Sequence, residues 1–125
     1  MRRLIDGGKN DTFEHQRFDV ATQKWQAGGT IPADPGLEAT GISLVTNGKA
    51  MLLFAIGSDA AHSIRVTRWD GSAWSAWSTV FGATAARTDL NGTGCRSKTH
   101  AAITWMEGTG TGPYQVVAAD VAALF

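Results

Sequence analysis

The sequence predicts an all-β protein made of antiparallel strands. Fifteen glycines and five tryptophans, together with many threonines and valines, are typical of short strands joined by tight turns. Two strong hairpin signals, Asn47-Gly48 and Asp70-Gly71, stand between strand-like segments. A third observation is a pattern that recurs after about fifty residues. Together these features predict four-stranded, blade-like antiparallel units repeated along the chain.

Length and charge limit the kind of protein this is. A chain of 125 residues is large enough for one domain, here taken as residues 1–125. Eleven basic and eleven acidic side chains give a formal charge of zero, so we expect neither nucleic acid nor a membrane as a partner. One cysteine and no apolar leader segment make a cytoplasmic location the default expectation.

The two turn signals order the middle of the chain. The first hairpin is expected to join strands at 43–46 and 49–54, because Asn and Gly both tolerate positive φ. The second is expected to join strands at 63–69 and 72–80, where apolar and polar residues alternate. Two consecutive hairpins predict four antiparallel strands.

Matching pieces on either side of these strands suggest an internal repeat. Asp19 and Asp70 are 51 positions apart, as are Gly57 and Gly108, and the repeat-like units are 1–35, 36–83 and 84–125. The chain then holds about two and a half units. The Gly-, Thr- and Asn-rich segment 84–99 is expected to be a long loop. The apolar tail that ends at Phe125 is expected to finish a strand or form a short helix and to dock on the domain.

Two segments carry a resemblance to known repeats. Residues 17–25 resemble the kelch pattern of an aromatic residue and Asp, a short turn, and then Trp. Residues 68–77, followed by Phe81-Gly82, resemble the repeat of bacterial propeller lectins. The resemblance implies β-propeller blades and, since a ring needs about four to eight of them, a homo-oligomer that completes the ring. The alternatives are a β-trefoil, whose Gln-x-Trp mark matches 23–25, and another compact β-barrel or sandwich.

The tryptophans around the second turn are the candidate ligand site. If Gly71 and Ser72 form the centre of that turn, Trp69 faces Trp74 across the hairpin, whereas a turn centred on Asp70 and Gly71 places Trp74 opposite Thr67. Trp74 and Trp77 point to opposite faces of a regular strand, so without a bulge one ring is left for exposure or an interface. The candidate ligand-binding residues are Arg68, Trp69, Asp70, Trp74 and Trp77.

A glycan is the ligand that these residue types suggest. The C–H face of a sugar stacks on an indole ring while neighbouring polar groups bind its hydroxyls. Fucose specificity is not expected, because an acidic residue and an Arg of the fucose-binding relatives are replaced here by Val66 and the apolar segment 52–56. The sequence therefore predicts a non-catalytic, carbohydrate-binding module.

Other functions have weaker support in the sequence. A structural or protein-interaction domain with wholly internal tryptophans is the first alternative. A small hydrolase with a site around Asp89, Cys95 and His100 is the second, although no orienting partner or oxyanion feature accompanies them. Neither a cofactor nor a metal is expected, because the three histidines and the single cysteine lack ligand spacing.

Overall fold

The computed structural model describes residues 2–6, 10–33, 41–57, 62–82, 86–93, 100–108 and 111–125. These residues form eleven strands and one short 3₁₀ helix, so the all-β prediction is confirmed. In chain order the elements are β1 (Arg2–Asp6), β2 (Asn10–Glu14), β3 (Arg17–Asp19), β4 (Lys24–Gln26), β5 (Gly41–Thr46), β6 (Met51–Ile56), β7 (Ile64–Trp69), β8 (Ser78–Phe81), β9 (Ala86–Thr93), β10 (Ala102–Gly108), β11 (Tyr114–Asp120) and η1 (Ala122–Leu124).

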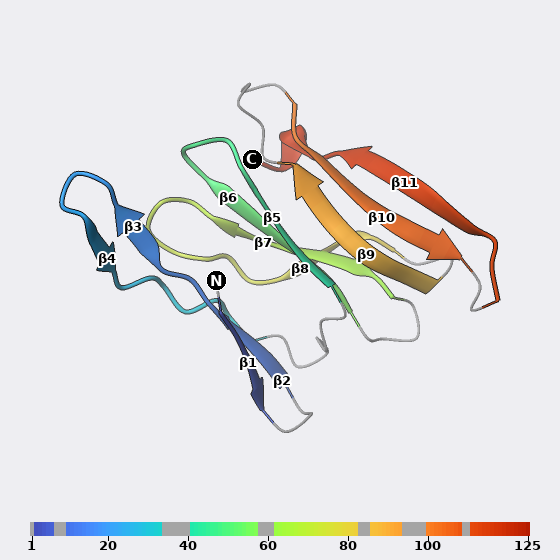
Figure 1. Cartoon of the computed structure of the whole chain (residues 1–125), viewed down its shortest axis with the longest axis horizontal. Helices are drawn as coiled ribbons and strands as arrows, with labels where there is room; N and C mark the ends of the chain where they lie inside the picture. Colours follow the sequence, from blue (N-terminus) through green and yellow to red (C-terminus); the bar gives the residue numbers. More distant parts are fainter. Residues whose placement is uncertain are drawn as a thin grey trace.

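The strands form antiparallel sheets of different sizes. The central sheet has four strands in the order β5-β6-β7-β8, which confirms the predicted pair of consecutive hairpins. A three-stranded sheet, β9-β10-β11, follows it in the chain, and two small hairpins, β1-β2 and β3-β4, precede it. Figure 1 shows the central sheet flanked by the small hairpins on one side and by β9–β11 on the other.

Asx-type turns close the hairpins. Asn47 Oδ1 accepts hydrogen bonds from the backbone N–H groups of Lys49 (2.9 Å) and Ala50 (2.8 Å), and strand pairing resumes with Thr46 opposite Met51. Gly48 has a φ of +86°, a conformation that favours glycine. Asn47 N–H also donates to the carbonyl oxygen of Ala50 (3.3 Å), so the turn is centred on Gly48 and Lys49, one residue beyond Asn47-Gly48.

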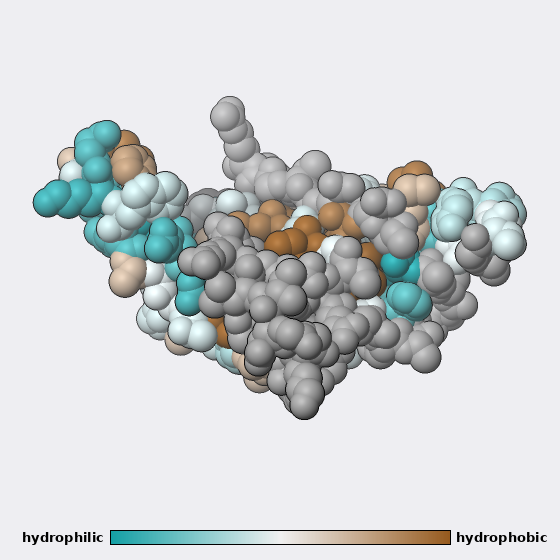
Figure 2. Space-filling model, turned by 60° about the horizontal axis from the view of Figure 1, so that its bottom comes forward, coloured by the Kyte–Doolittle hydropathy of each residue, from teal (hydrophilic) through white to brown (hydrophobic). Residues whose placement is uncertain are grey.

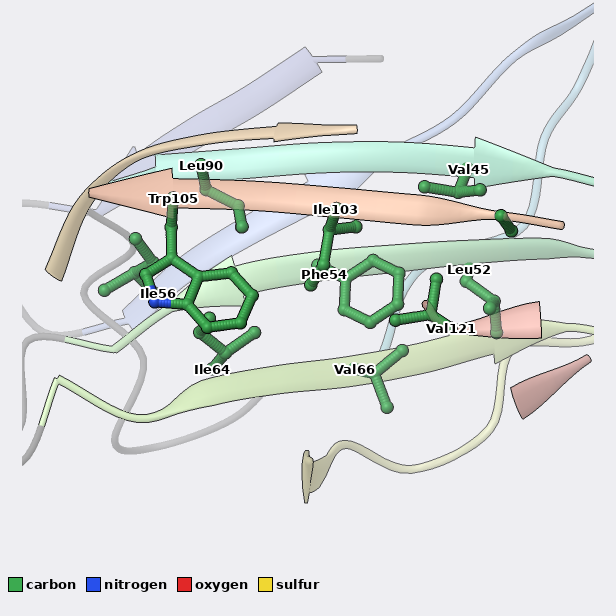
Figure 3. Close-up of a cluster of buried hydrophobic side chains, with 11 residues drawn as sticks. Val45, Leu52, Phe54, Ile56, Ile64, Val66, Leu90, Ile103, Trp105 and Val121 are labelled. Atoms are coloured by element: carbon green, nitrogen blue, oxygen red, sulfur yellow. The ribbon is translucent and has the colours of Figure 1, made fainter. Parts of the chain in front are cut away.

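The core between the central sheet and β9–β11 contains most of the large buried side chains. We call it the C-terminal cluster, and it consists of Val45, Leu52, Phe54, Ile56, Ile64, Val66, Leu90, Ala101, Ile103, Trp105 and Val121. Figure 3 shows these side chains meeting between strands of the two sheets. Leu124 and Phe125 pack against this cluster, which confirms that the tail docks on the domain.

The opposite face of the central sheet is also covered. Its apolar residues meet those of the N-terminal segments in a second core, the N-terminal cluster, which consists of Phe13, Ile31, Leu53, Ala55, Trp69 and Trp74. Since alternate residues of β6 enter the two clusters, this strand reads as a continuous apolar run and not as an alternating one. The central sheet is the middle layer of three.

The prediction of a loop over 84–99 is wrong for its first part. Residues 86–93 form β9, which pairs with β10 from Ala86 opposite Gly108 to Thr93 opposite Ala102. Buried Leu90 anchors this strand in the C-terminal cluster. Pairing and burial outweigh the low strand propensity of Gly and Asn in this segment. Residues 94–99 lie outside the described residues.

The predicted match of Gly57 with Gly108 pairs residues that point in different directions. Leu53 points to the N-terminal cluster, that is, toward the segment that precedes its sheet, and Ile103 points back toward the central sheet. These two residues are fifty positions apart. Aligning Gly57 with Gly108 would instead match Ile103 with Leu52, which points the other way, because a slip of one residue exchanges the two faces of a strand.

Candidate functional site

Two of the predicted site tryptophans belong to the core. Trp69 and Trp74 form an isolated antiparallel bridge, which is the first of the two registers that the sequence allows, and their ring centroids are 5.7 Å apart. Each ring is only 8% exposed. The imidazole of His15 packs edge-on against both, at 4.7 Å from Trp69 and 5.4 Å from Trp74. The prediction of Trp74 as an open sugar platform is therefore not supported, because the N-terminal segment covers it.

A hydrogen bond fixes the contact between Trp74 and His15. Trp74 Nε1–H donates to His15 Nδ1 over 2.9 Å, and the carbonyl oxygen of Gly29 lies 3.0 Å from the same nitrogen. An indole N–H can only donate, so we assign Nδ1 as the acceptor and place the imidazole proton on Nε2. His15 Nε2 is buried and has no partner among the described residues.

Trp74 and Trp77 pack on the same side of the central sheet, which the sequence allows only where the strand is interrupted between them. Residues 75–77 are not part of a strand, and Trp77 packs against the same N-terminal cluster that contains Trp74. Its Nε1–H donates to the carbonyl oxygen of Pro32 over 2.7 Å. The irregular segment 75–77 before β8 has the effect expected of a bulge. It turns the ring of Trp77 toward the N-terminal cluster, which also contains Trp74.

Trp74→Phe is expected to lower the free energy of unfolding by about 1–2 kcal/mol, because it removes the donor to a buried nitrogen and leaves most of the ring packing in place. Urea denaturation would measure the change. Trp25→Phe is the matched control, since this ring is 67% exposed, and it should change stability by less than about 0.5 kcal/mol. Equal effects of the two substitutions would contradict the buried role of Trp74.

Asp70 and Arg68, the polar members of the predicted site, are both exposed. Asp70 Oδ1 accepts hydrogen bonds from Ser72 N–H (2.8 Å), Ser72 Oγ–H (2.9 Å) and Ala73 N–H (3.0 Å). The backbone N–H groups of Ala73 and Ser72 are the main reason that the pKa of Asp70 falls to about 2. This carboxylate closes the turn through Oδ1.

The stabilising effect of Asp70 is expected to depend on pH. Because its folded pKa is about 2, below the ordinary 3.8, its contribution is complete above pH 4 and is lost as the pH falls toward 2. Asp70→Ala should lower Tm by a few degrees at pH 7 and by less at pH 2. Asp70→Asn retains the acceptor oxygen and is the control for the turn. Thermal unfolding followed by circular dichroism would measure both, and a pH-independent loss in Asp70→Ala would contradict this role.

A cleft lies where the predicted site meets the N-terminal part of the chain. Its volume is about 350 Å³, within the range of small-molecule pockets. Its lining combines β3, the β5–β6 hairpin and the end of β7, and consists of Arg17, Thr46, Gly48, Lys49, Met51, Trp69 and Gly71. Trp69 is thus the predicted site residue that reaches the cleft, with a small part of its ring.

The cleft has an apolar floor and two basic side chains. Met51 is half-buried and packs against the N-terminal cluster next to Trp69. Arg17 and Lys49 are exposed, and neither lies within ion-pair distance of a carboxylate in the part of the chain that is described. No local pattern predicts that Arg17 and Lys49 line one cleft, because 32 positions separate them in the sequence and they meet there only through the packing of two hairpins.

The nearest carboxylate on β3 is already engaged. Asp19 Oδ1 accepts from the N–H of Ala21 at 2.9 Å, and its Oδ2 accepts from Gln26 Nε2 at 3.0 Å. Its pKa is lowered chiefly by hydrogen bonds from Thr22, and the Arg17 charge adds only a small effect. Asp19 is the counterpart of Asp70 in its own hairpin and leaves the guanidinium of Arg17 available.

The residues of the hydrolase hypothesis are not brought together as a described site. His100 is exposed, and its Nδ1 lies 3.7 Å from Asp120 Oδ2. Asp89 lies on β9, and Cys95 lies outside the described residues. Within the described ranges no group of three His, Cys, Asp or Glu side chains is placed to hold a metal ion.

Comparison with protein-family models, with curated proteins and with solved structures finds no match to this chain. No helix among the described residues is long and apolar enough to cross a membrane.

Proposed function

We propose that the chain is a non-catalytic binding module that takes a saccharide in the cleft between β3 and the two central hairpin loops. The observation that carries this proposal is the composition of the cleft, whose lining combines the apolar residues Met51 and Trp69 with the basic residues Arg17 and Lys49. A few directed polar groups around an apolar surface are the usual form of a small-molecule site. The engagement of Asp19 and Asp70 in their turns speaks against an acid–base role at this cleft.

The position of the cleft supports the same function. Three hairpins, β3–β4, β5–β6 and β7–β8, contribute to it, and none of them contains a complete site by itself. The buried contacts of Trp69 with Trp74 and His15 hold its ring in place beneath the cleft. Such a rigid support lowers the entropy that a ligand must lose on binding.

Saccharide binding is tested with a glycan array followed by isothermal titration calorimetry of the best ligand. Met51→Ala is expected to weaken binding about threefold to tenfold, because it removes half of the apolar floor. Trp25→Ala is the control, since this exposed aromatic lies outside the cleft, and its affinity should equal that of the wild type. If no saccharide binds, or if only Trp25→Ala abolishes binding, the proposal fails and a protein-interaction domain becomes the better account.

We also propose that the sheets are consecutive propeller-like blades and that copies of the chain associate. The face of β10–β11 that points away from the C-terminal cluster carries Thr104 opposite Ala118 and Met106 opposite Val116. Val116 is 76% exposed. In the central sheet, the equivalent face is covered by β9–β11. We therefore expect a second copy of the chain to cover this face of β10–β11.

Apolar surface at the other end supports this association. Phe18 and Trp25, whose centroids are 5.2 Å apart, are the counterparts of Trp69 and Trp74 in the β3–β4 hairpin, but they are exposed. Figure 2 shows further apolar surface in the middle of one face of the molecule. Exposed apolar areas of this kind mark interaction sites.

Light scattering tests the association directly. The wild type is expected to be larger than a 13.2 kDa monomer, and Val116→Lys is expected to shift it toward the monomer. Thr79→Lys, on the exposed side of β8, is the control that should leave the size unchanged. A wild type that stays monomeric at millimolar concentration contradicts this proposal without affecting the saccharide site.

A further inference from the structure

We infer that the cleft selects an anionic saccharide, one that carries a carboxylate or sulfate group, over a neutral one. This inference rests on the proposed function and names its ligand class. Of the seven side chains or backbone positions that line the cleft, two are cationic, Arg17 and Lys49, and none is acidic. A neutral sugar would leave both charges without a counter-charge, whereas an acidic sugar would pair with them.

Arg17 and Lys49 differ from Arg87, whose charge is neutralised by a carboxylate. Arg87 is buried and is neutralised by Glu107 at 2.6 Å. Arg17 and Lys49 have no such partner among the described residues, and the carboxylate of Asp19 is held by its own turn. Their charges are therefore available to a bound anion.

The remaining polar groups of the cleft cannot replace these cations. The hydroxyl of Thr46 donates to the carbonyl oxygen of Ala50 (2.9 Å) and accepts from Gly48 N–H (3.0 Å). With Thr46 engaged in this way, Arg17 and Lys49 are the side chains that remain to donate to a ligand. A guanidinium presents two parallel N–H groups that match a carboxylate or a sulfate, and an ammonium adds a point charge.

The floor explains why the anion should be part of a sugar. Met51 and the edge of Trp69 offer an apolar surface that a small inorganic anion does not use. A sugar ring can lie on this floor while its acidic group reaches the cations. The volume of about 350 Å³ suits one or two sugar rings.

The test compares four probes by calorimetry: glucuronate, glucose 6-sulfate, glucose and acetate. Glucuronate or the sulfated sugar is expected to bind at least about tenfold more tightly than glucose, since each partly exposed charge contact contributes about threefold to fivefold. Acetate is expected to bind more weakly than either acidic sugar. The advantage of the acidic sugars should shrink between low salt and 0.5 M NaCl, where screening is strong.

Charge-removing variants locate the effect. Arg17→Gln and Lys49→Gln should each lower the affinity for the acidic sugar about threefold to tenfold and leave the affinity for glucose nearly unchanged. Lys24→Gln is the matched control, because it removes one exposed positive charge from β4 outside the cleft. It should retain the full preference.

Each remaining outcome has a defined meaning. If glucose binds as tightly as the acidic sugars and Met51→Ala weakens both, the saccharide site stands and the anionic preference is overturned. If acetate binds as tightly as glucuronate, the cleft is an anion site without sugar recognition, and the inference is overturned. If no probe binds and the glycan array is silent, the proposed function fails together with it.

Discussion

Phe54→Ala is expected to lower the free energy of unfolding by about 3–5 kcal/mol. Phe54 is fully buried at the centre of the C-terminal cluster, between Leu52 and Ile56 on the middle strand of the chain's largest core. Removing its ring leaves a cavity between two sheets. The sheets cannot collapse into this cavity, because hydrogen bonds hold their strands in place. Urea denaturation followed by circular dichroism would measure the loss.

An exposed phenylalanine gives the matched control for this substitution. Phe18 is 43% exposed in the β3–β4 hairpin, so Phe18→Ala should cost less than about 1 kcal/mol in dilute solution. The contrast tests the placement of the central sheet as the middle layer. Comparable losses for the two variants would show that Phe54 does not lie between packed sheets.

Glu107→Ala is expected to cost about 3–5 kcal/mol, because it leaves the charge of Arg87 buried without its partner. Arg87 is 5% exposed and donates from Nε to Glu107 Oε1 (2.6 Å), from Nη1 to the carbonyl oxygen of Phe81 (3.0 Å) and from Nη2 to that of Gly82 (2.9 Å). Trp105 Nε1–H donates to the same Glu107 oxygen over 2.8 Å. The network joins β9 and β10 to the end of β8.

A double substitution separates the cost of a lost partner from the value of the ion pair. Arg87→Met with Glu107→Leu removes both charges and should cost less than Glu107→Ala alone. Glu107→Gln, which retains an acceptor oxygen, should fall between the wild type and Glu107→Ala. Additive losses in the double variant would contradict a coupled pair.

The Glu107 carboxylate also makes the stability of the protein depend on pH. The hydrogen bond from Trp105 and then that from Arg87 lower the pKa of Glu107 below its ordinary value near 4.5. A carboxyl group with a lowered folded pKa stabilises the protein above its ordinary pKa, and this contribution is lost as the pH falls through the folded value. The stability difference between Glu107→Gln and the wild type is therefore expected to shrink below pH 4.

Local turn chemistry explains what the sequence could predict. Asp19, Asn47 and Asp70 each accept backbone N–H groups two and three residues further on, and a hairpin follows in each case. These signals depend on neighbouring residues alone. They were sufficient to place the central hairpins, but they left two registers for Trp74, of which the structure shows the pairing with Trp69.

Features that depend on distant contacts could not be predicted in this way. Strand β9 has a loop-like composition and is a strand because β10 pairs with it and Leu90 is buried. Trp77 returns to the layer of Trp74 because the chain leaves the strand between them. The meeting of Arg17 with Lys49 likewise depends on how two hairpins pack, which no local pattern records.

The proposed saccharide site in the cleft is tested most directly by a titration of glucuronate followed through the five tryptophan indole N–H signals in an ¹H–¹⁵N correlation spectrum. The indole of Trp69 lines the cleft, and Trp25, the most exposed tryptophan of those described, lies outside it. We predict a saturable shift of the Trp69 signal with little change at Trp25. A shift confined to Trp25, or no shift at any indole, would contradict binding in this cleft.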